Sequence, residues 1–481
     1  MDTNLAIIED TGDVIAAHMR HQAEEKFQKL LPLAEQGDAE AQYQMGKLYV
    51  DCRPGIPLND EREWHWNFEA AKNNHPLAMA SILLAQVTSP HKYPDERPWK
   101  DEATAVQTVI EKLERMATKS DNTDAMEYLG FFSLMGIGCE RNFSAAIQHL
   151  HSGAKLGCHE CMAALGITAL TTQTPIDDSQ FSEMEWMEKS WSEYNLLAGV
   201  HLGQMHLLKG DEGKDKAIEY FLAAANLGSG DAAYHLANCY SDGTGVTRSE
   251  ETSFRWYLTA AERNNDKALY ELARIDHYLP SIDVQPNQQN AWMEQAASLG
   301  EPKAMAEFGY MLLSGSNVER DVARGADMIK RGAKSGNAVS LHMLGRLYRD
   351  GEYVLQDYEA AAEYFRRSAA DDLPRGHLSY GYALLWGDGV EKDALLASEH
   401  FSEAFDAGIF DGAIGLGVAD YQLSHGPIRA LGFVLFGVRE IGGTPPNWVT
   451  EFIEELTEQV GEAGMALVEE FYAHLLRRFN N

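Results

Sequence analysis

A single pattern recurs along this chain at intervals close to 36 residues. Aligning the segment around Leu344 with the rest of the sequence finds a bulky residue at the same place in every copy. These anchor residues are Met45, Ile82, Leu129, Leu165, Leu202, Leu236, Leu272, Phe308, Leu344, Tyr380 and Leu416. Every step from Leu236 onward is 36 residues. A fixed period of this length predicts an array of stacked repeats.

Each copy has the pattern of two short amphipathic helices joined by a turn. In residues 337–372, apolar and small residues recur at spacings of one to four residues, which gives each helix one apolar stripe. The residue four positions before the anchor is always Ala, Cys, Ser or Gly, and the residue after the anchor is small in all copies but that of Ile82. Small residues at both places allow a neighbouring helix to approach closely.

Three segments carry a resemblance to a known family. They are LANCYSDGTGVTRSEETSFRWYLTAAERN (236–264), LGFFSLMGIGCERNFSAAIQHLHSGAKLG (129–157) and YGYALLWGDGVEKDALLASEHFSEAFDAG (380–408). Their sequence pattern resembles that of the Sel-like repeat family, relatives of the tetratricopeptide repeat, over roughly residues 38–426. The resemblance implies an all-α fold in which about eleven helix–turn–helix repeats form a right-handed superhelical solenoid. It implies a surface that holds protein partners, and it implies no reaction.

The domain organisation follows from where the pattern begins and fails. We expect an N-terminal capping helix in residues 1–37, the solenoid in 38–426 and C-terminal capping helices in 427–481. A docking or dimerisation role for the last helices is the alternative. The long step between Ile82 and Leu129 predicts an exposed loop insertion around residues 88–102.

The charge of the chain restricts its partners. Forty Lys and Arg against 73 Asp and Glu give a net charge of −33, which argues against nucleic acid, because phosphate binding needs a basic face. Two interpretations of this acidity remain open: a solvated exterior that maintains solubility, or attraction to a basic partner.

The expected location is cytoplasmic. MDTNLAIIEDTGD lacks the basic and apolar regions of a signal peptide, and no apolar run approaches the length of a membrane span. The five cysteines are scattered, which favours reduced thiols.

The sequence offers weak candidates for chemistry. The glycine clusters at 136–138, 243–245 and 387–389 lie between expected helices, so we interpret them as turns and not as phosphate loops. GCHEC (157–161) has two thiols and a histidine, but no second ligand pair completes a zinc site. We therefore expect no cofactor, no metal and no enzymatic activity; an enzyme using Cys158 and Cys161 is the least favoured reading.

The strongest functional prediction concerns one face of the first helices. By analogy with tetratricopeptide geometry, residues two before and two after each anchor face a groove, with further residues one turn on. The predicted partner-binding residues are Tyr234, Asn238, Tyr270, Arg274, His277, Tyr310, His342, Arg346, Arg349 and Tyr382. Tyr and Arg are enriched at binding hot spots. The competing interpretation is that these tyrosines pack between repeats and the arginines pair locally.

Earlier copies hold apolar residues at the same groove positions, such as Leu84, Phe131 and Val200. A partner or the 88–102 loop would cover them.

These observations predict a scaffold or adaptor that binds a protein or peptide, without catalysis. The alternative is an immunity-type inhibitor that blocks a basic toxin or enzyme.

Overall fold

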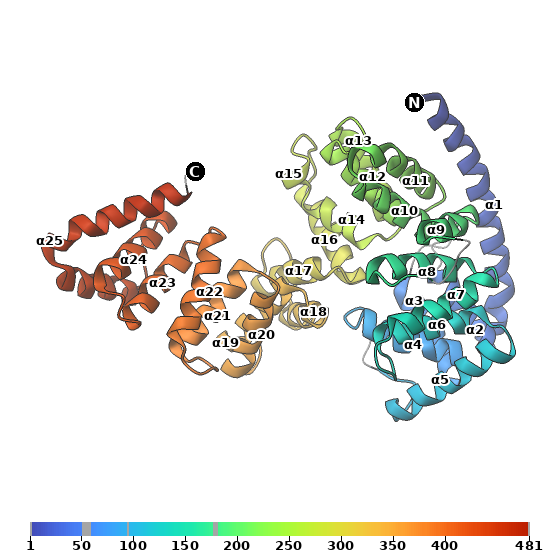
Figure 1. The fold of residues 1–481 in the computed structure, drawn as a ribbon, viewed down its shortest axis with the longest axis horizontal. Helices are drawn as coiled ribbons and strands as arrows, with labels where there is room; N and C mark the ends of the chain where they lie inside the picture. Colours follow the sequence, from blue (N-terminus) through green and yellow to red (C-terminus); the bar gives the residue numbers. More distant parts are fainter. Residues whose placement is uncertain (1, 51–58, 94–95, 177–180, 480–481) are drawn as a thin grey trace. The chain divides into compact units, whose positions relative to one another are not determined.

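The protein folds into helices that alternate in pairs along the chain (Figure 1). The structure is a computed structural model that describes residues 2–50, 59–93, 96–176 and 181–479; the side chains of residues 2–14, 50, 60, 277, 278 and 479 are not described. No strand occurs within these ranges. The chain divides into two compact units, unit 1 (Met1–Glu301) and unit 2 (Pro302–Asn481).

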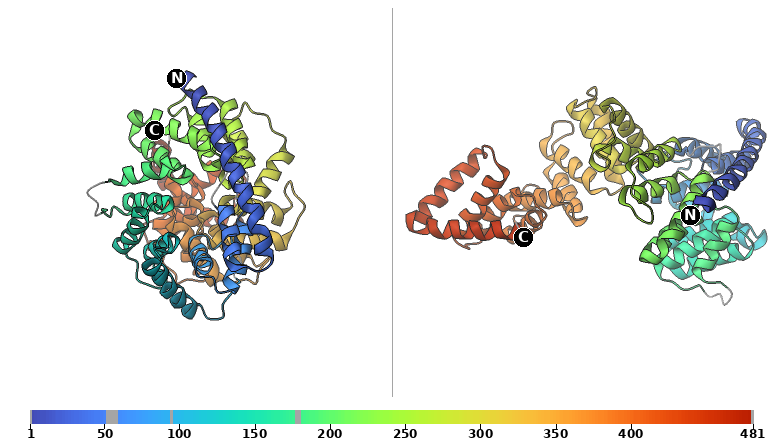
Figure 2. Two further views of the ribbon diagram at one scale, coloured as in Figure 1. Left: turned by 90° about the vertical axis from the view of Figure 1, so that its right-hand side faces the viewer. Right: turned by 90° about the horizontal axis from the view of Figure 1, so that it is seen from above.

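Unit 1 begins with the long helix α1 (Asp2–Glu35), which is the dark blue helix in Figures 1 and 2. The first helices of its pairs are α2 (Ala39–Val50), α4 (Pro76–Thr88), α6 (Thr123–Met135), α8 (His159–Thr172), α10 (Leu196–Leu208), α12 (Gly230–Asp242) and α14 (Asp266–Ala273). The second helices are α3 (Asp60–Lys72), α5 (Glu102–Lys119), α7 (Phe143–Lys155), α9 (Glu183–Ser192), α11 (Lys214–Asn226), α13 (Glu250–Glu262) and α16 (Pro286–Leu299). Two short elements, the 3₁₀ turn Gly210–Gly213 and α15 (Ile275–Tyr278), lie between helices of pairs.

Unit 2 continues the same alternation. Its first helices are α17 (Pro302–Ser314), α19 (Ala338–Asp350), α21 (Pro374–Trp386) and α23 (Asp411–Gln422). Its second helices are α18 (Val322–Lys334), α20 (Tyr358–Ala370), α22 (Ala394–Asp406) and α24 (Pro427–Ile441). The last element, α25 (Asn447–Phe479), contains a non-helical residue at Gly461, where φ is 62°. The domain boundaries expected from the sequence remain a proposal.

The eleven anchor residues all lie on first helices and are all buried, with exposed fractions from 0% to 8%. The small residue after the anchor is the point of closest helix contact. A Cβ atom built on Gly345 would stand 2.6 Å from the ring of Phe365 on α20, and one on Gly381 would stand 2.8 Å from the ring of Phe401 on α22. This packing explains why the sequence has a small residue there in nearly every copy.

The ends of the helices are fixed by local hydrogen bonds. In several copies a polar residue caps the first helix by accepting a hydrogen bond from the backbone N–H of the small residue three positions later. Examples are Asn122 with Ala125, Asn265 with Ala268 and Asn337 with Ser340. The expected turn glycines adopt left-handed φ values, such as 78° at Gly387, which other residues rarely tolerate. The all-α repeat fold predicted from the sequence is confirmed.

The insertion around residues 88–102 is only partly exposed, contrary to the expectation. Tyr93 stacks on Trp64 with ring centroids 5.0 Å apart, and its hydroxyl donates to Glu63 at 3.2 Å. Nearby, Lys92 Nζ lies 3.3 Å from Asp266 Oδ2. The prolines of this segment suggested an exposed loop, but its aromatic side chains add area to the core of unit 1.

Candidate functional site

The predicted residues of unit 1 make contacts within the protein. The hydroxyl of Tyr257 on α13 donates to Asn238 Oδ1 at 2.6 Å, and the ring of Tyr234 packs against Tyr257 at 6.1 Å. Arg274 lies over the ring of Tyr270 and donates to its hydroxyl, and Tyr270 is 4% exposed. In these four residues the structure favours the local-packing interpretation. The fifth predicted residue, His277, has a side chain outside the described set.

The predicted residues of unit 2 behave differently. His342, Arg346 and Arg349 occupy successive turns of α19 and line one cavity of about 440 Å³. Tyr382 on α21 lines a neighbouring cavity of about 200 Å³, which Arg349 also borders. Tyr310 on α17 is 47% exposed. Three predicted groove residues therefore converge on one place, and a fourth lies next to it.

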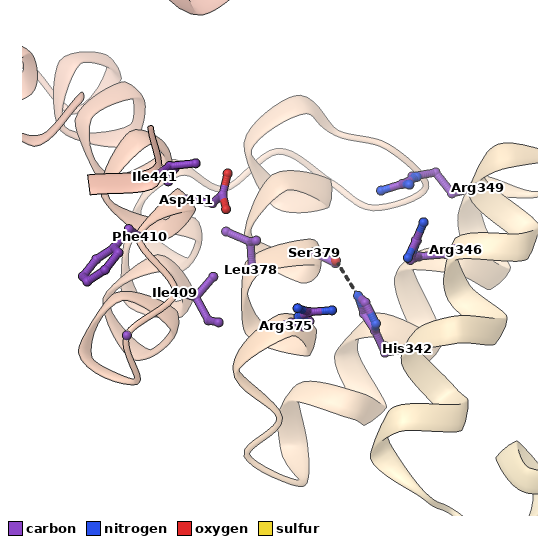
Figure 3. Close-up of a pocket in the computed structure, with 11 residues that line it drawn as sticks. His342, Arg346, Arg349, Arg375, Leu378, Ser379, Ile409, Phe410, Asp411 and Ile441 are labelled. Atoms are coloured by element: carbon purple, nitrogen blue, oxygen red, sulfur yellow. Dashed lines mark hydrogen bonds between the residues drawn. The ribbon is translucent and has the colours of Figure 1, made fainter. Parts of the chain in front are cut away.

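We call the larger cavity the arginine pocket. Its lining is His342, Arg346, Arg349, Arg375, Leu378, Ser379, Gly408, Ile409, Phe410, Asp411 and Ile441 (Figure 3). Figure 3 shows Arg346 and Arg349 on one side, with Ile409, Asp411 and Ile441 across the cavity and the ring of Phe410 turned away from it. The pocket thus has a cationic wall and an apolar wall.

Sequence reasoning missed Arg375, although a signal for it exists. Arg375 lies in the first turn of α21, three residues before Leu378, which does occupy a predicted groove position. Residues three apart on a helix share a face, so the groove rule could have been extended backwards by one turn. The contributions of Ile409, Phe410 and Ile441 could not be found in this way, because they come from the ends of other helices.

His342 is buried in the wall of the arginine pocket, with 8% of its surface exposed. Its Nε2 atom lies 3.0 Å from the Oγ atom of Ser379. Burial and the charges of Arg346, Arg375 and Arg349 lower the pKa of His342 to about 4. The imidazole is therefore neutral near pH 7, and the positive charge of the pocket belongs to its arginines.

Unit 1 contains a cavity of opposite character, which we call the acidic pocket. It has a volume of about 540 Å³ and combines Glu127, Glu160, Glu193 and Asp231 with apolar side chains. Phe131 and Val200 line it, as the apolar early copies suggested, together with Leu197 and Met19 of α1. The four carboxylates of the lining make this pocket negative.

The described part of the chain holds no cluster of three or more His, Cys, Asp or Glu side chains suited to a metal. Within GCHEC, the Sγ atom of Cys158 accepts a hydrogen bond from the backbone N–H of Cys161 at 3.2 Å and so caps α8. Cys161 is fully buried at the small-residue position. This motif therefore has a structural explanation. Cys52 lies outside the described residues.

Comparison with known proteins identifies the repeat. The Sel1 repeat model matches residues 39–53, 123–158, 196–229, 230–265, 266–301, 302–337, 338–373 and 374–409, which together exceed half of the chain. The chain belongs to the Sel1 repeat family. The Sel1 repeat fold is typically a non-catalytic scaffold, and the match indicates no catalytic family.

Relatives with curated names include two regulators. The chain is 27% identical over 248 residues to the chitin synthase regulator SKT5 of Saccharomyces cerevisiae, covering 49% of this chain and 34% of the relative. It is 24% identical over 151 residues to an exopolysaccharide production negative regulator of Rhizobium leguminosarum bv. viciae, covering 28% of this chain and 57% of the relative. The chain thus spans between a third and three-fifths of these relatives.

One solved structure shares the fold over nearly the whole chain. It is c5321, a protective antigen of uropathogenic Escherichia coli with the same type of repeat fold, at 21% identity and a TM-score of 0.50, covering 94% of both chains. This likeness concerns the fold alone. None of the helices in the described ranges is both long and apolar enough to cross a membrane.

Proposed function

We propose that this Sel1 repeat protein is a non-catalytic adaptor that holds a protein or peptide partner against the first helices of unit 2. The observation that carries the proposal is the convergence of His342, Arg346 and Arg349 from α19 with Arg375 and Ser379 from α21 around one cavity. Arginine side chains are enriched at binding hot spots, and the cavity has the size of a ligand site.

The relatives support a regulatory setting for this adaptor. Two of them are named as regulators, of chitin synthase and of exopolysaccharide production. A regulator without enzymatic activity acts by binding another protein. A repeat solenoid provides an extended surface for such binding. The proposal extends this role to the present chain and leaves the regulated process open.

The test is to capture partners with the full chain and compare variants. Proteins cross-linked to wild type are identified by mass spectrometry, and their affinity is measured for Arg346→Ala/Arg349→Ala. The matched control is Arg274→Ala in unit 1, where the guanidinium stacks on Tyr270. A partner that loses affinity for the double variant only supports the proposal. A partner that binds all three proteins equally would place the binding surface elsewhere.

The immunity-type alternative is favoured by one observation, the acidic pocket of unit 1. Glu127, Glu160 and Glu193 beside apolar side chains would attract a basic partner. Stoichiometric protection of cells against a toxin, lost when Glu160 and Glu193 are both replaced by Gln, would support this function. Protection that survives those replacements would argue against the acidic pocket as its site.

A further inference from the structure

The arginine pocket holds more positive charge than negative charge, with three arginines and one carboxylate in its lining. Within the described residues, Arg346 and Arg375 form no ion pair, and Arg349 Nε contacts only the exposed carboxylate of Asp350, at 2.8 Å. Other arginines of unit 2 pair closely with carboxylates: Arg366 with Glu363 at 2.7 Å, Arg429 with Asp420 at 2.6 Å and Arg439 with Glu469 at 3.0 Å. In a chain with a net charge of −33, unpaired guanidinium groups facing a cavity need an explanation.

The three guanidinium groups all influence the same side chain, His342. Arg346, Arg375 and Arg349 all contribute to lowering the pKa of His342, which lies between them in the pocket wall. Because His342 stays neutral, it adds no charge to the pocket. Its Nε2 atom can donate a hydrogen bond to Ser379 Oγ or accept one from it, depending on the tautomer. The cationic wall is therefore a cluster and not three separate surface charges.

The rest of the lining adds selectivity. Leu378, Ile409 and Ile441 form the apolar part, and Ile441 is 46% exposed. The one carboxylate of the described lining is Asp411. The helices α21 and α23 both begin at this pocket, and neither has a side-chain cap for its first backbone N–H groups. The N-terminus of α21 therefore increases the positive potential, whereas at α23 the carboxylate of Asp411 in the first turn offsets it.

We propose that the arginine pocket binds an acidic segment of a protein partner, with a carboxylate held by Arg346 and Arg375 and a neighbouring apolar side chain packed against Ile409 and Ile441. This inference rests on the proposed adaptor function and names the ligand of the same site. Guanidinium groups bind carboxylates through paired N–H donors. For this site we therefore expect an acidic partner, and not the basic partner that the net charge suggested.

The test uses random dodecapeptides displayed on phage and selected on the full chain. Enriched peptides are then synthesised with a fluorescent label, each beside a version in which Asn and Gln replace Asp and Glu. We expect enrichment of Asp or Glu next to Leu, Ile or Phe. We expect affinity to fall by about tenfold or more in Arg346→Ala/Arg375→Ala and in the amide peptides, because each loses a charge-assisted hydrogen bond.

Two controls separate binding from folding. Arg366→Ala removes an exposed, ion-paired arginine of the same unit and should leave affinity within about twofold, since surface pairs contribute little. Arg346→Lys/Arg375→Lys retains the charge and loses the guanidinium geometry, so it should bind more weakly than wild type and more tightly than the alanine variant. Thermal unfolding by circular dichroism checks that every variant is folded.

The outcomes separate the assignment of a carboxylate ligand from the adaptor function. Neutral or basic peptides that bind wild type and the alanine variant equally would overturn the carboxylate assignment and leave the adaptor function standing. Displacement of acidic peptides by inorganic phosphate at the same concentration would also overturn it, in favour of a general anion site. If selection enriches no peptide, and captured partners bind the Arg346→Ala/Arg349→Ala variant with unchanged affinity, the adaptor site itself is wrong.

Discussion

The Nε2 atom of His342 lies 3.0 Å from the Oγ atom of Ser379, which joins the first helices of two successive repeats. The contact lies in the wall of the arginine pocket, and it connects α19 with α21 without passing through the second helix between them. The neutral state of His342 is part of this arrangement, because burial and three arginines lower its pKa to about 4.

The first prediction concerns acid stability. A histidine pKa that is lower in the folded state means that the unfolded chain binds more protons, so stability is lost as the pH falls from about 6.5 towards about 4. His342 alone should contribute a loss of up to roughly 3 kcal/mol over that range. His342→Gln removes the titrating ring, so its unfolding temperature should fall less steeply with pH than that of wild type. Parallel pH profiles of the two proteins would show that His342 does not titrate in this way.

The second prediction concerns the small residue after the anchor. Gly345→Ala gains helix propensity but places a methyl group 2.6 Å from the ring of Phe365. Overpacking of this kind costs about 1–3 kcal/mol, so we expect a net loss of roughly 1–2 kcal/mol in urea unfolding. Phe365→Leu makes room, so the double variant should be more stable than the sum of the single effects implies. Strict additivity would show that the ring moves aside freely.

The third prediction concerns a buried carboxylate near the last repeat. The side chain of Asp420 is 1% exposed. Its Oδ2 atom lies 2.6 Å from Arg429 Nε, and its Oδ1 atom lies 3.0 Å from His425 Nδ1. Arg429→Ala leaves this charge without its main partner, and we expect a loss of about 2–4 kcal/mol. Arg439→Ala, which breaks an exposed pair with Glu469, should cost less than about 1 kcal/mol. Equal effects of the two substitutions on the unfolding temperature would contradict this ranking.

The fourth prediction concerns the thiols. Cys139 is exposed, whereas Cys161 and Cys239 are buried. The hydrogen bond with Cys158 and burial raise the pKa of Cys161, and burial raises the pKa of Cys239 to about 11. N-ethylmaleimide should therefore label Cys139 in the native protein and reach Cys161 and Cys239 only in denaturant, as read by peptide mass spectrometry. Rapid native labelling of Cys161 would revive a reactive role for GCHEC.

The repeat period was enough to predict the fold because each copy repeats the same packing constraints. The anchor, the small residue before it and the small residue after it all concern contacts within one copy or between neighbours. Such contacts have fixed offsets in sequence, so a single chain displays them many times over. The helix caps follow the same logic, as Asn122, Asn265 and Asn337 show.

The candidate site was less predictable because groove positions differ between copies. The same offset from the anchor holds Arg274, which stacks on Tyr270, and Arg346, which forms no ion pair with the described residues. No local pattern separates these two arginines; the difference depends on which side chains surround each one. The apolar wall of the arginine pocket, with Ile409 and Ile441, comes from later elements that no offset rule relates to α19.

Unit 1 also contains contacts that span most of its length. Lys92 and Asp266 are separated by 174 residues, and Ala16 of α1 belongs to one cluster with Leu196 and Leu227. The C-terminal half of α1 packs on the next helix, where Ala23 and Ala34 join one cluster with Met45 of α2, whereas Ala16 meets residues that come much later. Burial of Ala16 therefore depends on residues about 180 to 210 positions later in the chain, so this contact closes only after several repeats have formed.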